Sequence, residues 1–119
     1  MIKKIKIGLI QSKSLGTIQS NIDLAIKNIK KAAKKNAKII CLPELFLTNY
    51  FCQTESHSNF KLAEKIPGKT SRIFCNLAKE LGVVLNITMF EKKTSGFYHN
   101  TSIIIGENGN ILTKYRKMH

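Results

Sequence analysis

The sequence predicts one α/β domain, in which strands and helices alternate and the strands form a layered sheet. Three observations support this prediction. Short apolar runs are rich in β-branched residues, two longer segments carry apolar residues at steps of three and four, and these elements follow the order β α β α β β β. The 119 residues are enough for a single domain, 1–119, and too few for two.

The first part of the chain predicts a strand, a helix and a second strand. Residues 4–10 are rich in isoleucine and partly alternate, which is typical of a strand. Residues 17–36 carry one apolar stripe, with Thr17 or Ser20 available as the N-cap of a helix. The apolar run at 38–42 predicts a buried strand, which a proline ends.

The middle of the chain predicts a long loop and then a second helix. Residues 44–66 have no clear period, and we expect a loop with one helical turn near 60–64. A second apolar stripe follows, and it predicts a helix that Thr70 or Ser71 caps and that Gly82 ends.

The last part of the chain predicts three strands. Residues 83–90 are almost wholly apolar, as in a strand buried on both faces, and 91–96 turn the chain. The strands at 98–105 and 111–116 are joined through an Asn-Gly pair, which is a strong hairpin signal. Two helices cover only one face of such a sheet, so we expect more of the fold than this sequence holds, unless the second face is polar enough to stay in water.

The net charge of +13 comes from 20 basic and 7 acidic residues. It is compatible with a basic module that binds nucleic acid, but 18 of the basic residues are lysines, and base recognition favours arginine. Lysine, isoleucine and asparagine are abundant together, which is typical of an A/T-rich coding sequence. We expect no nucleic-acid partner and interpret the lysine cluster as the solvated face of the first helix. Its members are Lys27, Lys30, Lys31, Lys34, Lys35 and Lys38.

Composition also bears on the cellular compartment and on metals. No apolar run approaches the ~18 residues of a membrane span, and the apolar stretch near the N-terminus is too short for a signal peptide. Three cysteines are too few for a disulfide framework, so we expect a reduced, cytoplasmic protein with no membrane partner. Neither the cysteines nor His57, His99 and His119 have the spacing of metal ligands, and we expect no metal.

Two charged residues are candidate catalytic residues because each follows a predicted strand. Glu44 follows an apolar strand and a proline, at the carboxyl end of a strand, where α/β sheets bind ligands. Partial burial there suits a general base, although a solvated or capping glutamate is the commoner case. Lys117 follows the last strand and is placed to stabilise an oxyanion, although a surface lysine is again the commoner case.

The three cysteines have different surroundings. Cys41 and Cys75 lie within apolar patterns, which predicts small buried side chains. Cys52 lies in the irregular region just after Tyr50. It is a candidate nucleophile, but a role in a pocket or in packing is the better interpretation.

Three stretches of the sequence together resemble the nitrilase superfamily of carbon–nitrogen hydrolases. They are Leu42-Pro43-Glu44-Leu45-Phe46, Tyr98-His99-Asn100-Thr101-Ser102 and Lys114-Tyr115-Arg116-Lys117-Met118-His119. A fourth stretch, Tyr50-Phe51-Cys52-Gln53-Thr54-Glu55, is similar to the N-carbamoylputrescine amidases, which are ureidohydrolases of polyamine biosynthesis. The similarity runs through nearly the whole chain.

The resemblance implies a fold and a set of site residues. The fold would be the N-terminal part of an α-β-β-α sandwich that usually forms homo-oligomers. The family works through a Glu, a Lys and a Cys, which places the general base on Glu44 and the oxyanion-stabilising lysine on Lys117. The nucleophilic cysteine falls beyond residue 119, so we expect the chain alone to be inactive. Tyr50 and Cys52 would contribute to binding the substrate.

The resemblance also implies a reaction and its partners. The substrate would be a small ureido or amide compound, in the first place N-carbamoylputrescine, which is cleaved to putrescine, ammonia and carbon dioxide. No metal or organic cofactor is implied. Two alternatives stay open, namely another amidase or ureidohydrolase of the same family and a non-catalytic basic module. A separate chain that carries the cysteine is a further candidate partner.

Overall fold

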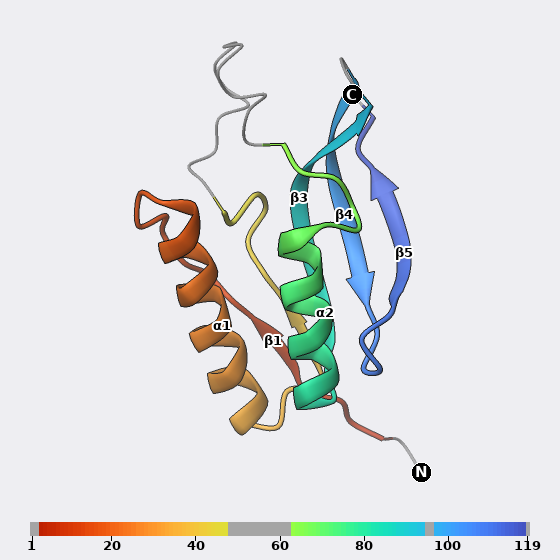
Figure 1. The fold of residues 1–119 in the computed structure, drawn as a ribbon. Coiled ribbons are helices and arrows are strands. Elements are labelled where there is room, and N and C mark those ends of the chain that lie inside the picture. Colours follow the sequence, from red (N-terminus) through yellow and green to blue (C-terminus); the bar gives the residue numbers. More distant parts are fainter. Residues whose placement is uncertain (1–2, 48–62, 95–96, 119) are drawn as a thin grey trace.

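Two helices lie side by side on one face of a five-stranded sheet (Figure 1). The structure is a computed structural model, which describes residues 3–47, 63–94 and 97–118. The predicted order of elements is confirmed. They are β1 (Ile7–Leu9), α1 (Ile18–Lys34), β2 (Ile39–Cys41), α2 (Lys69–Leu81), β3 (Val84–Thr94), β4 (Phe97–Ile105) and β5 (Ile111–Arg116).

The order of strands in the sheet follows the chain, β1-β2-β3-β4-β5. The first three strands are parallel, because a helix crosses over between each of them and the next. The last three are antiparallel. As a result, β2 and β5 run in the same direction, and the residues that follow them lie at the same end of the sheet.

The first helix begins and packs as predicted. The Thr17 side chain accepts a hydrogen bond from the backbone N–H of Ser20 at 3.1 Å, which is the N-cap contact. The apolar stripe, including Ile22 and Ile29, is buried in the core, and all six lysines of the predicted solvated cluster are exposed.

The second helix begins earlier than predicted. Its N-cap is Gly68, whose backbone N–H donates to the Ser71 hydroxyl at 2.8 Å, so Ser71 lies inside the first turn. Thr70 is not a cap either, because its hydroxyl donates to the Glu64 carboxylate at 2.7 Å. Gly82 ends the helix as predicted, with a φ of 65° in the left-handed region that glycine tolerates.

The third strand is longer than predicted and is not fully buried on both faces. It runs through Thr94, across residues predicted to be a turn, because it pairs with β4 along that length. Leu85 and Met89 are buried beneath the helices, whereas Asn86 and Phe90 on the other face are only half-buried.

The predicted helical turn near residue 60 is also wrong where it can be compared with the structure. Glu64 forms an isolated parallel bridge with Glu91, and its backbone N–H donates to the Phe90 carbonyl at 3.0 Å. The earlier residues of that predicted turn lie outside the described residues.

The last two strands form the predicted Asn-Gly hairpin. Gly109 has a φ of 84°, and its N–H donates to the Gly106 carbonyl at 2.9 Å. Ile105 faces Ile111 and Ile104 faces Thr113, so one residue, Leu112, is extra. This bulge determines which side chains of β5 point toward the helices and which point to the other face.

The sheet face opposite the helices carries exposed apolar side chains. Ile7, Leu9 and Tyr115 are 57%, 80% and 63% exposed. This agrees with the expectation that two helices cover only one face. Among the described residues, no helix is long and apolar enough to cross a membrane.

Candidate active site

Glu44 and Lys117 meet at the end of the sheet where β2 and β5 both finish. They are 73 residues apart in the sequence, and Lys117 Nζ donates to Glu44 Oε1 in an ion pair. Each side chain is 38% exposed, so the pair is open to solvent. A carboxylate and an ammonium in such a place are able to move a proton and to stabilise negative charge.

Asn100 contacts both members of this pair. Its side-chain Nδ2 donates to Glu44 Oε1 at 2.9 Å, and its backbone carbonyl accepts from the Lys117 N–H at 2.9 Å. Asn100 lies within one of the stretches that resemble the family, but no role was predicted for it. The hairpin register would have revealed it, because Asn100 lies opposite Lys117.

A tight turn directly after Glu44 keeps that side chain at the open end of the sheet. Leu45 has a φ of 50°, a left-handed conformation that costs a non-glycine residue roughly 1–2 kcal/mol. Burial offsets this cost, since Leu45, Phe46 and Leu47 are all at most 8% exposed. The Phe46 ring also packs edge-on against Phe74, with centroids 5.3 Å apart.

A buried amide from α1 holds the same turn. Asn21 is 3% exposed, and its Nδ2 donates to the Leu47 carbonyl at 2.6 Å. Its Oδ1 accepts from the Leu15 N–H at 2.7 Å. Sequence reasoning missed this residue, although a polar side chain beside the apolar stripe of a helix is a usable signal.

A second carboxylate, Glu91, lies on the helix-covered face and is almost fully buried. Its side chain is 2% exposed and accepts hydrogen bonds from Arg116 Nε at 2.8 Å, Lys114 Nζ at 3.1 Å and Thr101 Oγ1 at 2.9 Å. Burial alone would raise the pKa of Glu91, but these three donors together lower it to about 2. The Arg116 pKa is raised in turn, chiefly by its hydrogen bond to Glu91.

The Glu91 cluster is therefore a structural contact and a poor general base. A base must accept a proton near neutral pH, and a carboxyl with a pKa of about 2 stays ionised there. Sequence reasoning missed Glu91 too. The signal was its alternation with Ile87 and Met89, which places it on the buried face of β3.

The other predicted site residues are not brought to this pair by the part of the chain that the structure describes. Tyr50 and Cys52 lie outside the described residues, as do His57 and His119. Cys41 and Cys75 are free thiols that are half-buried, less than predicted, and burial raises the pKa of the Cys75 thiol. No group of three potential metal ligands occurs within residues 3–47, 63–94 and 97–118.

Comparison with known proteins shows the family of this chain. Residues 6–119 match the family model described as carbon-nitrogen hydrolase. The chain belongs to the carbon–nitrogen hydrolase family. This chain is 35% identical over 116 residues to omega-amidase NIT2-B of Xenopus laevis, and the match covers 98% of this chain and 41% of that protein. It is 36% identical over 117 residues to the N-carbamoylputrescine amidase of Oryza sativa subsp. japonica, which covers 98% and 38%.

Solved structures of the family have the same fold as this chain. The carbon–nitrogen hydrolase from Helicobacter pylori G27 matches with a TM-score of 0.90 and 33% identity, over 97% of this chain and 40% of that one. Nit3 of Saccharomyces cerevisiae, described as a member of branch 10 of the nitrilase superfamily, matches with a TM-score of 0.75 and 31% identity. The nitrilase-like fold predicted from the resemblance is confirmed. The chain spans less than half the length of the relatives it matches.

Proposed function

We propose that Glu44 is the general base and Lys117 the oxyanion-stabilising lysine of a carbon–nitrogen hydrolase whose nucleophilic cysteine comes from outside these 119 residues. The observation that carries the proposal is the ion pair between two residues 73 positions apart. Family membership supports a hydrolase. Asn100 supports both roles, because it holds the carboxylate of Glu44 and the backbone of Lys117 together.

In the first half of the reaction, the Glu44 carboxylate takes the proton of the thiol. The thiolate then attacks the carbonyl carbon, so that a C–S bond forms and the carbonyl oxygen becomes negatively charged. The Lys117 ammonium stabilises that oxyanion. When the oxyanion collapses, the C–N bond breaks, and Glu44 returns its proton to the departing ammonia.

In the second half, Glu44 acts as a base again. It takes a proton from water, the hydroxide attacks the thioester-like carbonyl, and the C–S bond breaks to restore the thiol. For a ureido substrate the product is a carbamic acid, which decomposes to an amine and carbon dioxide. The sum is one substrate and one water giving one amine, one ammonia and one carbon dioxide.

The substrate proposed first is N-carbamoylputrescine, as in the Oryza sativa relative. The second candidate is a compound with a terminal amide, because omega-amidases match this chain equally well. Tyr50 and Cys52 are the proposed substrate-binding residues of this chain. The complete enzyme is proposed to be a homo-oligomer, or to combine this chain with a separate one that carries the cysteine.

The test joins this chain to a cysteine-bearing partner. A chimera in which it replaces the matching 40% of the Helicobacter pylori hydrolase should release ammonia from a ureido or terminal-amide substrate, whereas the isolated chain should not. Glu44→Gln in the chimera should lower kcat by about 10²–10⁴-fold. Lys117→Met should lower it by about 10²–10³-fold. The matched controls Glu107→Gln and Lys79→Met change exposed residues away from the pair and should keep the rate.

Two results would contradict the proposal. One is undiminished turnover by the chimera with Glu44→Gln, which would mean that another group is the base. The other is ammonia release by the isolated chain that Glu44→Gln abolishes, which would mean that no outside cysteine is needed.

A further inference from the structure

Asn100 lies in the interior of the sheet, where the candidate site is formed. It belongs to β4, which lies between β3 and β5, and it pairs with Phe90 of β3. On its other side its carbonyl accepts from the Lys117 N–H at 2.9 Å. The backbone of Asn100 is therefore held from both sides, and a side chain on such a strand is fixed more precisely than one on a loop.

The Asn100 side chain and Lys117 hold the same oxygen of Glu44. Asn100 Nδ2 donates to Glu44 Oε1 at 2.9 Å, and Lys117 Nζ donates to that oxygen too. Glu44 follows β2, which pairs with neither β4 nor β5. A lysine ammonium is carried by a flexible four-carbon chain, whereas the asparagine side chain is short, so the amide is the stiffer of these two links.

We propose that Asn100 is a positioning residue, whose amide holds the Glu44 carboxylate in the orientation in which it exchanges protons. The inference rests on the proposed role of Glu44 as the general base. Asn100 acts through Glu44, so its loss should slow the proton transfers and leave substrate binding nearly unchanged.

The amide also distinguishes the two protonation states of Glu44. An N–H donor bonds well to a carboxylate and therefore favours the ionised form over the carboxylic acid. Within the described residues, the charged side chain that faces Glu44 is Lys117, which favours the ionised form as well. Without the amide, Glu44 should gain its proton at a higher pH, and a negative charge in place of the amide should raise that pH further.

The test compares three side chains of similar size at position 100, in the chimera with the Helicobacter pylori hydrolase. They are the native asparagine, Asn100→Leu and Asn100→Asp. Asn100→Leu should lower kcat by about tenfold, which is the loss expected for one hydrogen bond to a charged group, and should change KM by less than about twofold. The acid limb of the kcat/KM profile should move to higher pH in Asn100→Leu and further in Asn100→Asp.

A second measurement needs neither the cysteine nor turnover. ¹³C NMR of the 119-residue chain follows the carboxyl carbon of Glu44 as the pH changes, and the resonance is assigned by its loss in Glu44→Gln. The pH of its titration should rise in the same order, from the parent chain to Asn100→Leu and then to Asn100→Asp.

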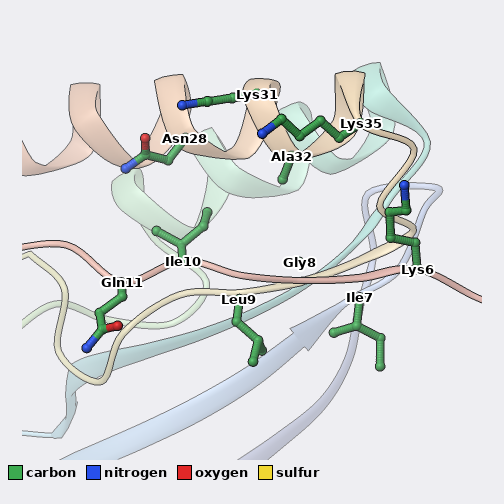
Figure 2. Close-up of a pocket in the computed structure, with 10 residues that line it drawn as sticks. All are labelled: Lys6, Ile7, Gly8, Leu9, Ile10, Gln11, Asn28, Lys31, Ala32 and Lys35. Carbon is green, nitrogen blue, oxygen red and sulfur yellow. The ribbon is translucent and has the colours of Figure 1, made fainter.

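The matched control is Asn28→Leu. Asn28 is half-buried like Asn100, but it lies on α1, where it lines a hollow of about 340 Å³ beside β1 (Figure 2). This change should keep kcat within about twofold of the parent and leave the acid limb in place.

Two results would overturn the inference. One is a lower kcat with an unmoved acid limb in both Asn100 variants, because the amide would then only stabilise the fold. The other is a Glu44 carboxyl carbon that titrates identically in all three chains. Glu44→Gln separates these results from a failure of the proposed function. If that variant turns over undiminished, Glu44 is not the base; if it is slow while the Asn100 variants behave like Asn28→Leu, only the positioning role is wrong.

Discussion

Two carboxylates of this chain each pair with basic side chains of β5 or of the residue just after it, but their surroundings differ. Glu91 is 2% exposed, and both of its oxygens accept hydrogen bonds from Arg116, Lys114 and Thr101. Glu44 is 38% exposed and shares one oxygen between Lys117 and Asn100. Burial with full hydrogen bonding fixes a carboxylate in its ionised form and stabilises the fold, whereas partial exposure lets a carboxylate exchange protons.

The same strand serves both carboxylates because successive side chains of a strand point to opposite faces. Arg116 points to the helix-covered face and binds Glu91, and the next residue, Lys117, reaches Glu44. The stabilising contact of Arg116 with Glu91 and the proposed catalytic contact of Lys117 with Glu44 therefore come from adjacent residues. We therefore expect a substitution of Glu91 to lower the stability of the fold, and a substitution of Glu44 or Lys117 to lower the activity of the complete enzyme.

The largest expected effect on stability is that of Glu91→Gln. The glutamine amide has one oxygen that accepts hydrogen bonds and one N–H₂ group that cannot. Because Arg116 and Lys114 are both donors, at least one hydrogen bond of the cluster would be lost. Removing one partner of a buried ion pair typically costs 3–5 kcal/mol, and we expect about 3 kcal/mol here, because both cations are about a third exposed and regain water. Urea unfolding measures the change.

A suitable control for this substitution is Glu80→Gln, which changes an exposed carboxylate on α2. It should alter the free energy of unfolding by less than about 0.5 kcal/mol. If Glu91→Gln were as mild as this control, the buried cluster would not be a stabilising contact and the comparison would fail.

The stabilisation by Glu91 should also depend on pH, with a sign that its pKa determines. The folded-state pKa of about 2 lies below the ordinary value of 4.5, so the stabilisation is complete above pH 5 and is lost as the pH falls toward 2. The difference in unfolding free energy between the parent chain and Glu91→Gln should shrink over this acid range. A difference that stays constant from pH 5 to pH 2 would contradict the assignment.

The smallest expected effect on stability is that of Lys117→Met. The pair with Glu44 is 38% exposed on both sides, and exposed ion pairs contribute less than about 1 kcal/mol. Urea unfolding of this variant should therefore nearly match the parent, even though the same substitution should greatly slow the proposed reaction. A loss as large as that of Glu91→Gln would show that both carboxylates are structural.

Local signals in the sequence predicted most of the elements. Thr17 caps α1, Gly82 ends α2, and Gly109 turns the last hairpin, because each residue has a conformational or hydrogen-bonding preference that acts within a few positions. The errors arose where distant parts of the chain decide. Thr94 stays in β3 because β4 pairs with it, and Glu64 is extended because it pairs with Glu91.

The charged residues of the candidate site were predicted from the sequence, but the contacts between them and the asparagines around them were not. Glu44 and Lys117 stood out by their positions and by the resemblance, but their contact depends on the order of strands in the sheet. Asn100 and Asn21 carry no strong local signal of their own. Their importance lies in the distant groups to which they donate, the Glu44 carboxylate for Asn100 and the Leu47 carbonyl for Asn21, and no short window of sequence contains that information.

The extra residue at Leu112 has a consequence for which mutations the gene can tolerate. Leu112 is the residue without a partner in β4, so deleting its codon would leave Thr113 opposite Ile104 and Arg116 opposite Thr101, and every later side chain would keep its face. Arg116 would keep its contact with Glu91, and Lys117 would keep its contact with Glu44. An insertion in this short stretch would instead add a second extra residue to the strand. Loss of Leu112, whose side chain is 62% exposed, should therefore be found more often among functional descendants than an insertion beside it.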